Sequence, residues 1–356
     1  MILVANGLII EEKGISVTIR DIARIAGVSE STVSRSLNNS PLISGATKER
    51  VNKIAREVRF EFNAGARSLS TSRTGTIGVI FPELYEDFQN SLFLTSLMKD
   101  VRHTLERYDL DTITTFPKNS YSGTSNIYKL LAQRKVDGLL VVHPDIDMEE
   151  WKHIQAREIP FVVLHYKQRH TDMDFMNYCY TDHRYGGYIA AKHLLQQGCS
   201  NILCVQLNRD ELQFAERTEG FKDALKEWNI SIDDDCFLTA ECGFEAGIRL
   251  VEQNPHVIKK ADGIFAHADI LALGIIRGLS ELGRNVPRDI GVVGYDDIEL
   301  DSYFTPGLTT IHQKHEDLAR KACEYLAETI AEGDCERDPL QLISKPHLVI
   351  RDSSHQ

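Results

Sequence analysis

The sequence predicts an α/β protein in which a small helix-turn-helix head precedes a body of two lobes built on parallel sheets. Near the start of the chain, a glycine separates two short helical patterns between Ile22 and Asn38. From Gly75 onward, short apolar runs alternate with amphipathic stretches. Alternation of this kind is typical of parallel sheets covered by helices, and the body is too long for one comfortable hydrophobic core. Two doubly wound lobes are therefore expected.

Three short helices are predicted in the head. Thr18 and Asp21 have capping-box spacing ahead of the first apolar stripe, and Gly27 favours a helix end because it readily adopts positive φ. Ser29 is suited to cap the second helix, and a third apolar stripe lies within residues 45–58. Helices this short are marginal in water, so the three must bury their stripes together.

The second helix carries the side chains that favour DNA binding. The hydroxyl residues Ser31, Thr32, Ser34 and Ser36 accompany Arg35. Short donors and one arginine suit a helix that lies against phosphates and base edges. The alternative is the solvated face of a small helical bundle.

Charge is distributed unevenly between the two parts of the chain. Residues 17–74 hold ten Lys and Arg against five Asp and Glu, although the whole chain carries a formal charge of −12. A basic head on an acidic body is expected where one end of a protein meets phosphate.

The opening stretch MILVANGLII is apolar, but it has neither a basic region nor a small-residue cleavage site, and it is too short to span a bilayer. Residues 1–16 are expected to be a disordered extension, or to reflect a start site assigned too early. Seven scattered cysteines without a C-x-x-C motif favour reduced thiols and a cytoplasmic location, with no membrane partner.

Strands in the body are expected at the apolar runs TIGVIF, VDGLLVV, IPFVVLH, NILCVQL, DGIFAHA and DIGVVGYDD. Helices are expected within residues 93–107, 185–197, 213–228 and 269–283. In such sheets, ligands bind beyond the carboxyl ends of the strands, so the two lobes should enclose a binding cleft.

No catalytic motif is visible in the body. The sequence contains no G-x-S-x-G, P-loop or H-E-x-x-H, so neither enzymatic activity nor a cofactor is expected. His165 and His267 end two predicted strands and could reach the cleft. The expectation is a hydrogen-bonded polar lining rather than a metal pair, and no metal site is predicted.

Six segments carry a family resemblance: VTIRDIARIAGVSESTVSRSLN, NAGARSLSTSRTGTIGVI, RTEGFKDAL, ADILALG, VVGYDDIEL and PGLTTIHQ. In this order they resemble the lactose/galactose/purine-repressor (LacI/GalR) family, from Val17 to about Asp352. The resemblance implies a helix-turn-helix DNA-binding domain over 17–62 and a hinge helix or linker over 63–74. It further implies a two-lobed core over 75–352 that is similar to periplasmic sugar-binding proteins.

The resemblance also implies a transcriptional regulator, most simply a repressor, whose affinity for a near-palindromic double-stranded operator depends on a small effector in the cleft. A homodimer is expected because a palindromic site demands two-fold symmetry. The chain ends HLVIRDSSHQ, without a leucine heptad that could assemble a tetramer.

Carried over residue by residue, the family's DNA contacts fall on Thr18, Ser29, Glu30, Ser31, Thr32, Ser34, Arg35, Asn38, Asn63, Arg67 and Leu69. Glu30, Ser31 and Arg35 take the recognition-helix positions, and Arg35 could fork onto a guanine. Glu30 either accepts from a cytosine amine or favours the positive end of its helix.

Leu69 aligns with the family's leucine wedge, which enters the minor groove and kinks the duplex. The alternative is a stray leucine in a linker. Phe62 stands where the family usually has proline, and Gly65 lies inside the segment that must become helical. The hinge is therefore expected to fold only on DNA.

Effector contacts implied by the resemblance are Arg217, Asp296 and Gln313, which form a donor–acceptor set suited to vicinal hydroxyls. The alternative for Arg217 and Asp296 is an interlobe salt bridge without a ligand.

Three departures from the family pattern leave the effector open: Ala268 before Asp269, His165 at a position that can hold aspartate, and Cys242 at one that can be aromatic. Phe88 and Phe244 are expected to supply the stacking surface instead. A sugar or sugar derivative is predicted, with a nucleobase as the alternative.

Overall fold

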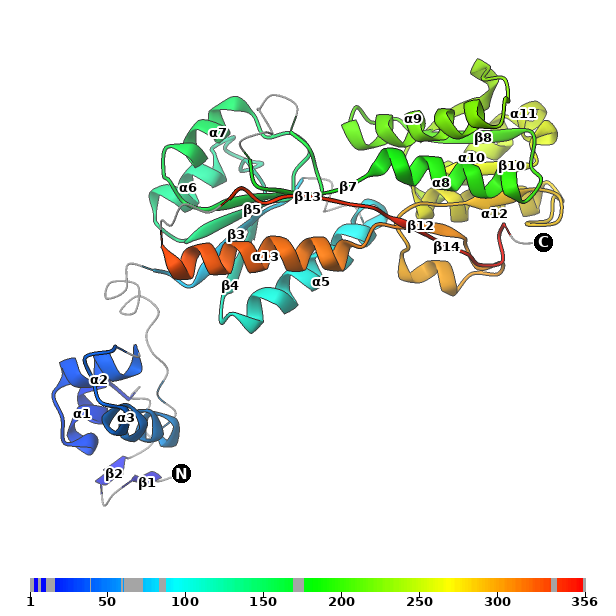
Figure 1. The fold of residues 1–356 in the computed structure, drawn as a ribbon. Helices are drawn as coiled ribbons and strands as arrows, with labels where there is room; N and C mark the ends of the chain where they lie inside the picture. The colour runs from blue at the N-terminus through cyan, green and yellow to red at the C-terminus, as the bar shows by residue number, and fades with distance from the viewer. Residues whose placement is uncertain are drawn as a thin grey trace. The chain divides into compact units, whose positions relative to one another are not determined.

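The protein is described by a computed structural model that covers residues 3–5, 8–10, 17–38, 40–58, 60, 73–82, 88–168, 176–333 and 338–354. For residues 3–5, 8–10 and 88–91 only the backbone is described. The chain divides into two compact units, Met1–Thr74 and Gly75–Gln356, each of which is described by itself (Figure 1).

The first unit contains the three predicted helices, α1 (Ile19–Ala26), α2 (Glu30–Leu37) and α3 (Gly45–Glu57). Their apolar stripes meet in one core around the fully buried Ile22, Val33 and Val51. The prediction of three helices that share a core is confirmed.

The N-terminal stretch differs from the disordered extension that the sequence predicted. Strands β1 (Leu3–Ala5) and β2 (Leu8–Ile10) pair antiparallel, with Ala5 opposite Leu8. The residues between the strands are Asn6 and Gly7, and this dipeptide is the strongest short-range signal for a two-residue hairpin loop. The expected disordered extension, or early start site, took no account of this hairpin signal. The rest of residues 1–16 lies outside the described residues.

Lobe 1 of the second unit is a six-stranded sheet with the strand order β13-β7-β6-β5-β3-β4, and every neighbouring pair is parallel. Its strands are β3 (Thr76–Ile80), β4 (Asp111–Thr115), β5 (Gly138–Val141), β6 (Phe161–Leu164), β7 (Tyr178–Thr181) and β13 (Gln341–Ser344). Helices α5 (Phe88–Arg107) and α13 (His315–Glu332) lie side by side on one face (Figure 1). Helices α6 (Asn126–Ala132) and α7 (Met148–Gln155) cover the other face.

Successive residues of β3 serve the two faces of this sheet. Ile77 and Val79 pack with α5 and α13, whereas Ile80 packs with α6 and α7. A strand covered on both faces needs apolar side chains at every position, which explains the continuous run TIGVIF.

Lobe 2 is a four-stranded parallel sheet with the strand order β11-β10-β8-β9. Its strands are β8 (Ile202–Leu207), β9 (Phe237–Ala240), β10 (Gly263–Ala266) and β11 (Gly291–Val293). Helices α8 (His183–Gln196) and α9 (Leu212–Glu227) share one core with the sheet. Helices α10 (Phe244–Gln253), α11 (Pro255–Lys260) and α12 (Asp269–Glu281) share the other, and short 3-10 turns occupy Asp234–Cys236 and Glu299–Ser302.

Three segments of the described chain connect the lobes. The first runs from β7 into α8, the second from β12 (Thr310–His312) into α13, and the third from β13 into β14 (His347–Val349). Strands β12 and β14 pair antiparallel beside lobe 2. The Thr181 hydroxyl donates to the Gln313 carbonyl oxygen at 3.4 Å, and the Asp182 amide donates to the Ser344 carbonyl oxygen at 2.9 Å. These two hydrogen bonds join the three connecting segments to one another.

Helices α8 and α9 touch through their backbones. A Cβ atom added at Gly187 would lie 2.0 Å from the carbonyl oxygen of Arg217, and one at Gly220 would lie 1.8 Å from that of Arg184. Both distances are far below van der Waals contact, so the approach of the two helices requires glycine at both positions.

The predicted fold class, an α/β protein with parallel sheets in two lobes, is confirmed. None of the helices within the described ranges is long and apolar enough to cross a membrane. None of the six cysteines in the described part of the chain forms a disulfide bond.

Candidate functional site

The helix pair α1–α2 is built by local capping. The Thr18 amide donates to Asp21 Oδ2 at 3.1 Å, while the Thr18 hydroxyl accepts from the Asp21 amide at 3.4 Å. Gly27 ends α1 with φ of 65°, and the Ser29 hydroxyl begins α2 by accepting from the Thr32 amide at 3.2 Å. These bonds satisfy amides that a helix start otherwise leaves without partners, and they fix the tight turn that the sequence predicted.

Helix α2 presents a polar face to solvent. Glu30, Ser31 and Arg35 are exposed, and Ser34 and Asn38 are half-buried. Ser31 and Arg35 are four residues apart, so they lie on the same side of the helix. This is the arrangement of short donors and one guanidinium that was expected of a DNA-facing helix.

Two residues of α2 have local roles that the sequence did not predict. The Glu30 carboxylate pairs with Arg20 of α1, with Oε1 3.3 Å from Nε. Ser36 is only 1% exposed, and its hydroxyl donates to the Thr32 carbonyl oxygen at 2.7 Å. Ser36 therefore belongs to the head's interior rather than to its solvent face.

The remaining expected DNA contacts, Asn63, Arg67 and Leu69, lie outside the described residues, as does most of the hinge segment 63–74. They stay predictions from the family resemblance.

A cavity of about 620 Å³, partly open to solvent, lies between the lobes. Lobe 1 contributes Leu92 and Phe93 from α5 and His165 from the end of β6. Lobe 2 contributes residues of α9, of the loops before α9 and α12, and of the segment after β11. The cavity lies where the sequence predicted the cleft, beyond the carboxyl ends of parallel strands.

Arg217 of α9 is the central cation of this cavity, although its side chain is only 2% exposed. Its Nε donates to His183 Nδ1 at 3.3 Å, and Nη1 donates to the His267 carbonyl oxygen. The guanidinium carbon lies 3.5 Å from the centroid of the Tyr295 ring. Its Nη2 is 4.0 Å from Asp296 Oδ1, so the predicted pair is present, and both residues belong to lobe 2. The contact between Arg217 and Asp296 is therefore not a salt bridge between the lobes, which was the alternative interpretation.

Asp296 follows β11 and is held by the crossing segment. Gln313 Nε2 donates to its Oδ1 at 2.7 Å, so the structure brings Arg217, Asp296 and Gln313 together as predicted. Burial raises the pKa of Asp296 to about 8, although the positive charge of Arg217 opposes the rise. The carboxyl group is therefore mostly protonated near neutral pH.

Two neutral histidines, His165 and His267, line the same space, and a third, His183, contacts Arg217. Burial, reinforced by the charge of Arg217, lowers the pKa of His165 to about 3, and it holds the pKa of His183 and His267 well below the ordinary value. Within the described residues, His183 Nε2, His267 Nδ1 and Gln313 Oε1 are buried without a hydrogen-bond partner. Buried polar atoms without partners are costly, and such atoms beside a cavity suit a polar ligand.

Backbone strain coincides with the cavity. His165 has φ of 72° and Asp296 has φ of 129°, both in the left-handed region that non-glycine residues rarely adopt. Such strain persists only where the surrounding structure imposes it, and it is concentrated at functional sites.

The aromatic residues differ from the prediction. Phe93 of α5 lines the cavity and packs against His165, with ring centroids 4.6 Å apart, and Phe214 of α9 lies on the lobe 2 side. Phe244 is not among the lining residues and instead contacts Phe304, at 6.1 Å between ring centroids. The side chain of Phe88 lies outside the described part. The sequence did not indicate Phe93 as a lining residue, because a shift of one position along a helix changes the face on which a side chain lies.

Cys242 and Ala268, the two other departures from the family pattern, both line the cavity. Both side chains are small. At these two positions the cavity therefore gains space for a ligand but no strong hydrogen-bonding group.

Comparison with known proteins gives two family matches. The model for "Bacterial regulatory proteins, lacI family" matches residues 18–63, and that for "Periplasmic binding protein-like domain" matches residues 191–354. The "HTH-type transcriptional repressor PurR" of Vibrio atlanticus (strain LGP32) is 32% identical over 336 residues, covering 94% of this chain and 97% of the relative. The protein of the same name from Vibrio vulnificus (strain CMCP6) is 32% identical over 337 residues, covering 94% and 98%.

Solved structures give the same architecture. The Lac repressor dimer bound to operator and the anti-inducer ONPF has a TM-score of 0.75 at 25% identity, covering 96% of this chain and 100% of that chain. The regulator CelR in complex with cellobiose has a TM-score of 0.70 at 24% identity, covering 95% and 99%. A LacI-family regulator from Enterococcus faecium with bound ribose has a TM-score of 0.68 at 27% identity, covering 79% and 98%.

Proposed function

The chain belongs to the LacI family of DNA-binding transcriptional repressors, and from this premise we propose that a small effector in the cavity between its lobes controls its affinity for operator DNA. The observation that carries the proposal is the polar set Arg217, Asp296 and Gln313, of which Arg217 and Asp296 line that cavity. Gln313 Oε1 and the neighbouring His267 Nδ1 have no hydrogen-bond partner within the described residues, and a polar ligand in the cavity would supply one. No catalytic step is proposed for these groups.

Operator binding is assigned to α2. Its exposed Ser31 and Arg35 are placed to reach base edges, while the capped helix starts and the remaining hydroxyls suit phosphates. The Arg20–Glu30 pair is well exposed and contributes little stability, so Glu30 remains free to exchange this partner for a base.

The effector is proposed to be an uncharged molecule. The charged side chains at the cavity are two arginines, Arg209 and Arg217, and two acids, Glu211 and Asp296. With the histidines neutral and Asp296 mostly protonated, the two arginines face one ionised acid, Glu211, so the lining carries a net charge of about +1, which gives little attraction for a multiply charged ligand.

A sugar is the first candidate. The Arg217 guanidinium donates, the side-chain oxygen Oε1 of Gln313 accepts, and the Asp296 carboxyl group can do either, which is what neighbouring hydroxyls require. The structurally similar CelR and Enterococcus faecium regulators were solved with cellobiose and with ribose.

A purine is the second candidate, and the PurR relatives favour it. Phe93 and Phe214, which both line the cavity, offer aromatic surfaces to a flat base. The unpartnered nitrogen of His267 and oxygen of Gln313 suit the edge of a base as well as a hydroxyl.

The active form is proposed to be a homodimer, because two copies of α2 are needed to read the two halves of a palindromic operator. Light scattering should give the mass of a dimer at micromolar concentration. A stable monomer or tetramer would contradict this part of the proposal.

Thermal-shift screening of the purified protein against sugars and purine bases tests the effector assignment, because a ligand that binds only the folded state raises the melting temperature. A shift with one class selects that class. No shift with either class would contradict an effector drawn from these two groups.

A crossed pair of variants then tests the allosteric arrangement. Asp296→Ala should abolish the effector response and leave effector-free DNA binding nearly intact. Leu69→Ala should weaken operator binding and leave effector affinity unchanged in DNA-free protein. The reverse pattern, in two variants shown by circular dichroism to be folded, would refute the assignment of both residues.

A further inference from the structure

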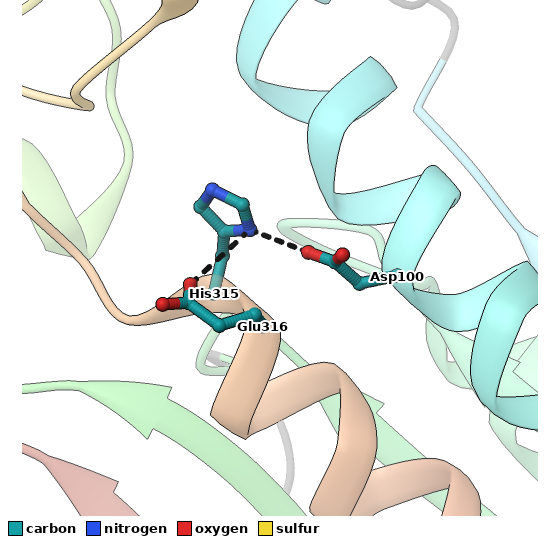
Figure 2. Close-up of side chains that lie close together, drawn as sticks. All are labelled: Asp100, His315 and Glu316. Carbon is teal, nitrogen blue, oxygen red and sulfur yellow. Dashed lines mark hydrogen bonds and ion pairs between the residues drawn. The ribbon is translucent and has the colours of Figure 1, made fainter.

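A second group of metal-binding side chains lies at the amino end of α13, beside the segment that crosses from lobe 2 to lobe 1. His315 and Glu316 begin this helix, and Asp100 faces them from α5 (Figure 2). One ligand atom from each of these residues lies within 4.8 Å of the others. Sequence inspection could not find this group, because Asp100 is far from the other two residues along the chain.

The distances within this group are close to those around a bound ion. His315 Nδ1 is 2.8 Å from Asp100 Oδ2 and 3.7 Å from Glu316 Oε2. Zn²⁺ binds nitrogen and oxygen at about 2.0–2.2 Å, which places tetrahedral ligand atoms about 3.4 Å apart. The two distances lie on either side of this value, so small side-chain movements would admit an ion.

The hydrogen bond between His315 and Asp100 occupies the ring nitrogen that would bind the metal ion. An ionised carboxylate has no proton to donate, so His315 Nδ1 must carry the proton of the bond to Asp100. If the imidazole proton moves from Nδ1 to the other ring nitrogen, Nε2, a metal ion can bind the freed Nδ1 lone pair together with both carboxylates. One imidazole and two carboxylates form a neutral complex with a divalent ion.

Glu316 is also oriented from outside the group. His312 Nε2 lies 3.0 Å from Glu316 Oε1, and His312 Nδ1 lies 2.9 Å from Asp297 Oδ2. Asp297 in turn accepts from Arg351 Nη2 at 2.6 Å. Metal-binding carboxylates are typically held by such outer hydrogen bonds, which fix their direction.

From this geometry we propose that Asp100, His315 and Glu316 bind a divalent transition-metal ion, with His312 as the residue that positions Glu316. The ion would join α5 to α13 within lobe 1 and, through His312 and Asp297, connect lobe 1 to lobe 2. Phe93 lies between this site and the effector cavity, because its ring packs edge-on against His315 at 5.5 Å and also lines the cavity.

The test uses the full-length, untagged protein after treatment with a chelator, with Zn²⁺ and Co²⁺ as probes at neutral pH. Isothermal titration should show one Zn²⁺ bound per chain. D100N and E316Q keep the shape of their side chains, and each should weaken binding at least about tenfold, the smallest loss typical even of outer partners. H256A removes an exposed histidine on α11, outside the group, and should bind as the parent does.

Co²⁺ distinguishes this site from the cysteines. Bound through nitrogen and oxygen it gives only weak visible bands, whereas thiolate ligands add charge-transfer bands in the near ultraviolet. No binding, binding that survives D100N and E316Q, or thiolate bands that account for all the bound Co²⁺ would each overturn the proposal.

Discussion

The ammonium group of Lys167 in lobe 1 and the carboxylate of Glu216 in lobe 2 form an ion pair, with Nζ 2.8 Å from Oε1. Tyr180 donates its hydroxyl proton to the other oxygen of Glu216 at 2.9 Å, and Lys167 Nζ lies 4.3 Å from the centroid of the Tyr180 ring. The three residues form a contact between the lobes that any opening of the cavity must break.

Glu216→Gln should therefore weaken effector binding to DNA-free protein by roughly two- to tenfold, as expected for a partly exposed charged contact. Titration calorimetry measures the affinity once screening has identified the effector. Lys118→Met is the matched control, because it breaks an ion pair within lobe 1, Nζ to Asp147 Oδ2 at 2.7 Å. Equal losses in the two variants, or no loss in Glu216→Gln, would show that the interlobe pair does not stabilise the ligand-bound arrangement.

Asp296 should make stability depend on pH in a defined direction. Burial raises its pKa in the folded protein to about 8, against 3.8 as the ordinary value. Between these values the folded state holds one proton more than the unfolded state, so a rise in pH through this window removes stability. Asparagine does not titrate, so the unfolding free energy of Asp296→Asn relative to the parent should increase across the window and stay constant above it. Urea denaturation of ligand-free protein at a series of pH values measures this difference, and a difference independent of pH would contradict the prediction.

DNA binding should depend strongly on salt because the head carries the chain's basic excess. Raising the salt from about 50 to about 200 mM should lower operator affinity by orders of magnitude in a dimer that makes several phosphate contacts. Fluorescence anisotropy with a labelled operator measures the slope, and unchanged affinity would argue against phosphate neutralisation.

Arg35→Ala should cost about 1–3 kcal/mol of binding free energy and relax specificity at one base position in each half-site. Binding to a set of operators with single base changes measures this effect. A uniform loss over all operators would instead identify Arg35 as a phosphate contact.

Gly220→Ala tests the contact between α8 and α9. An added Cβ would lie 1.8 Å from the Arg184 carbonyl oxygen, so the helices would have to separate, and a loss of about 3 kcal/mol or more in unfolding free energy is expected. Glu219→Ala, at the exposed neighbouring position of α9, should change stability by less than about 1 kcal/mol. Similar effects of the two substitutions would mean that the crossing can adapt.

Hydrophobic periodicity and capping residues in the sequence correctly predicted individual helices and strands. The run TIGVIF became a strand buried on both faces, and the spacing of Thr18, Asp21 and Gly27 predicted the first helix and its end. The edge strand β4 was missed because its sequence DTITT is polar and only partly buried.

Contacts between distant segments could not be predicted from the sequence in the same way. The family motifs indicated Arg217 and Asp296, and the two residues do lie together. The packing of Phe93 against His165 depends instead on how α5 lies over its sheet, and the ion pair of Lys167 with Glu216 depends on how the two lobes meet. Neither relation leaves a periodic signal in the chain.

The glycine contact between α8 and α9 also bears on how this protein could acquire a new ligand. The carbonyl oxygen of Arg217 lies in the crossing itself, so the backbone position of the central cation is set by main-chain atoms and not by the side chains that line the cavity. Those side chains are free to vary without disturbing the frame that holds Arg217. Substitutions at lining positions such as Cys242 and Ala268 can therefore change the shape of the cavity while the glycine contact that fixes the backbone of Arg217 is kept.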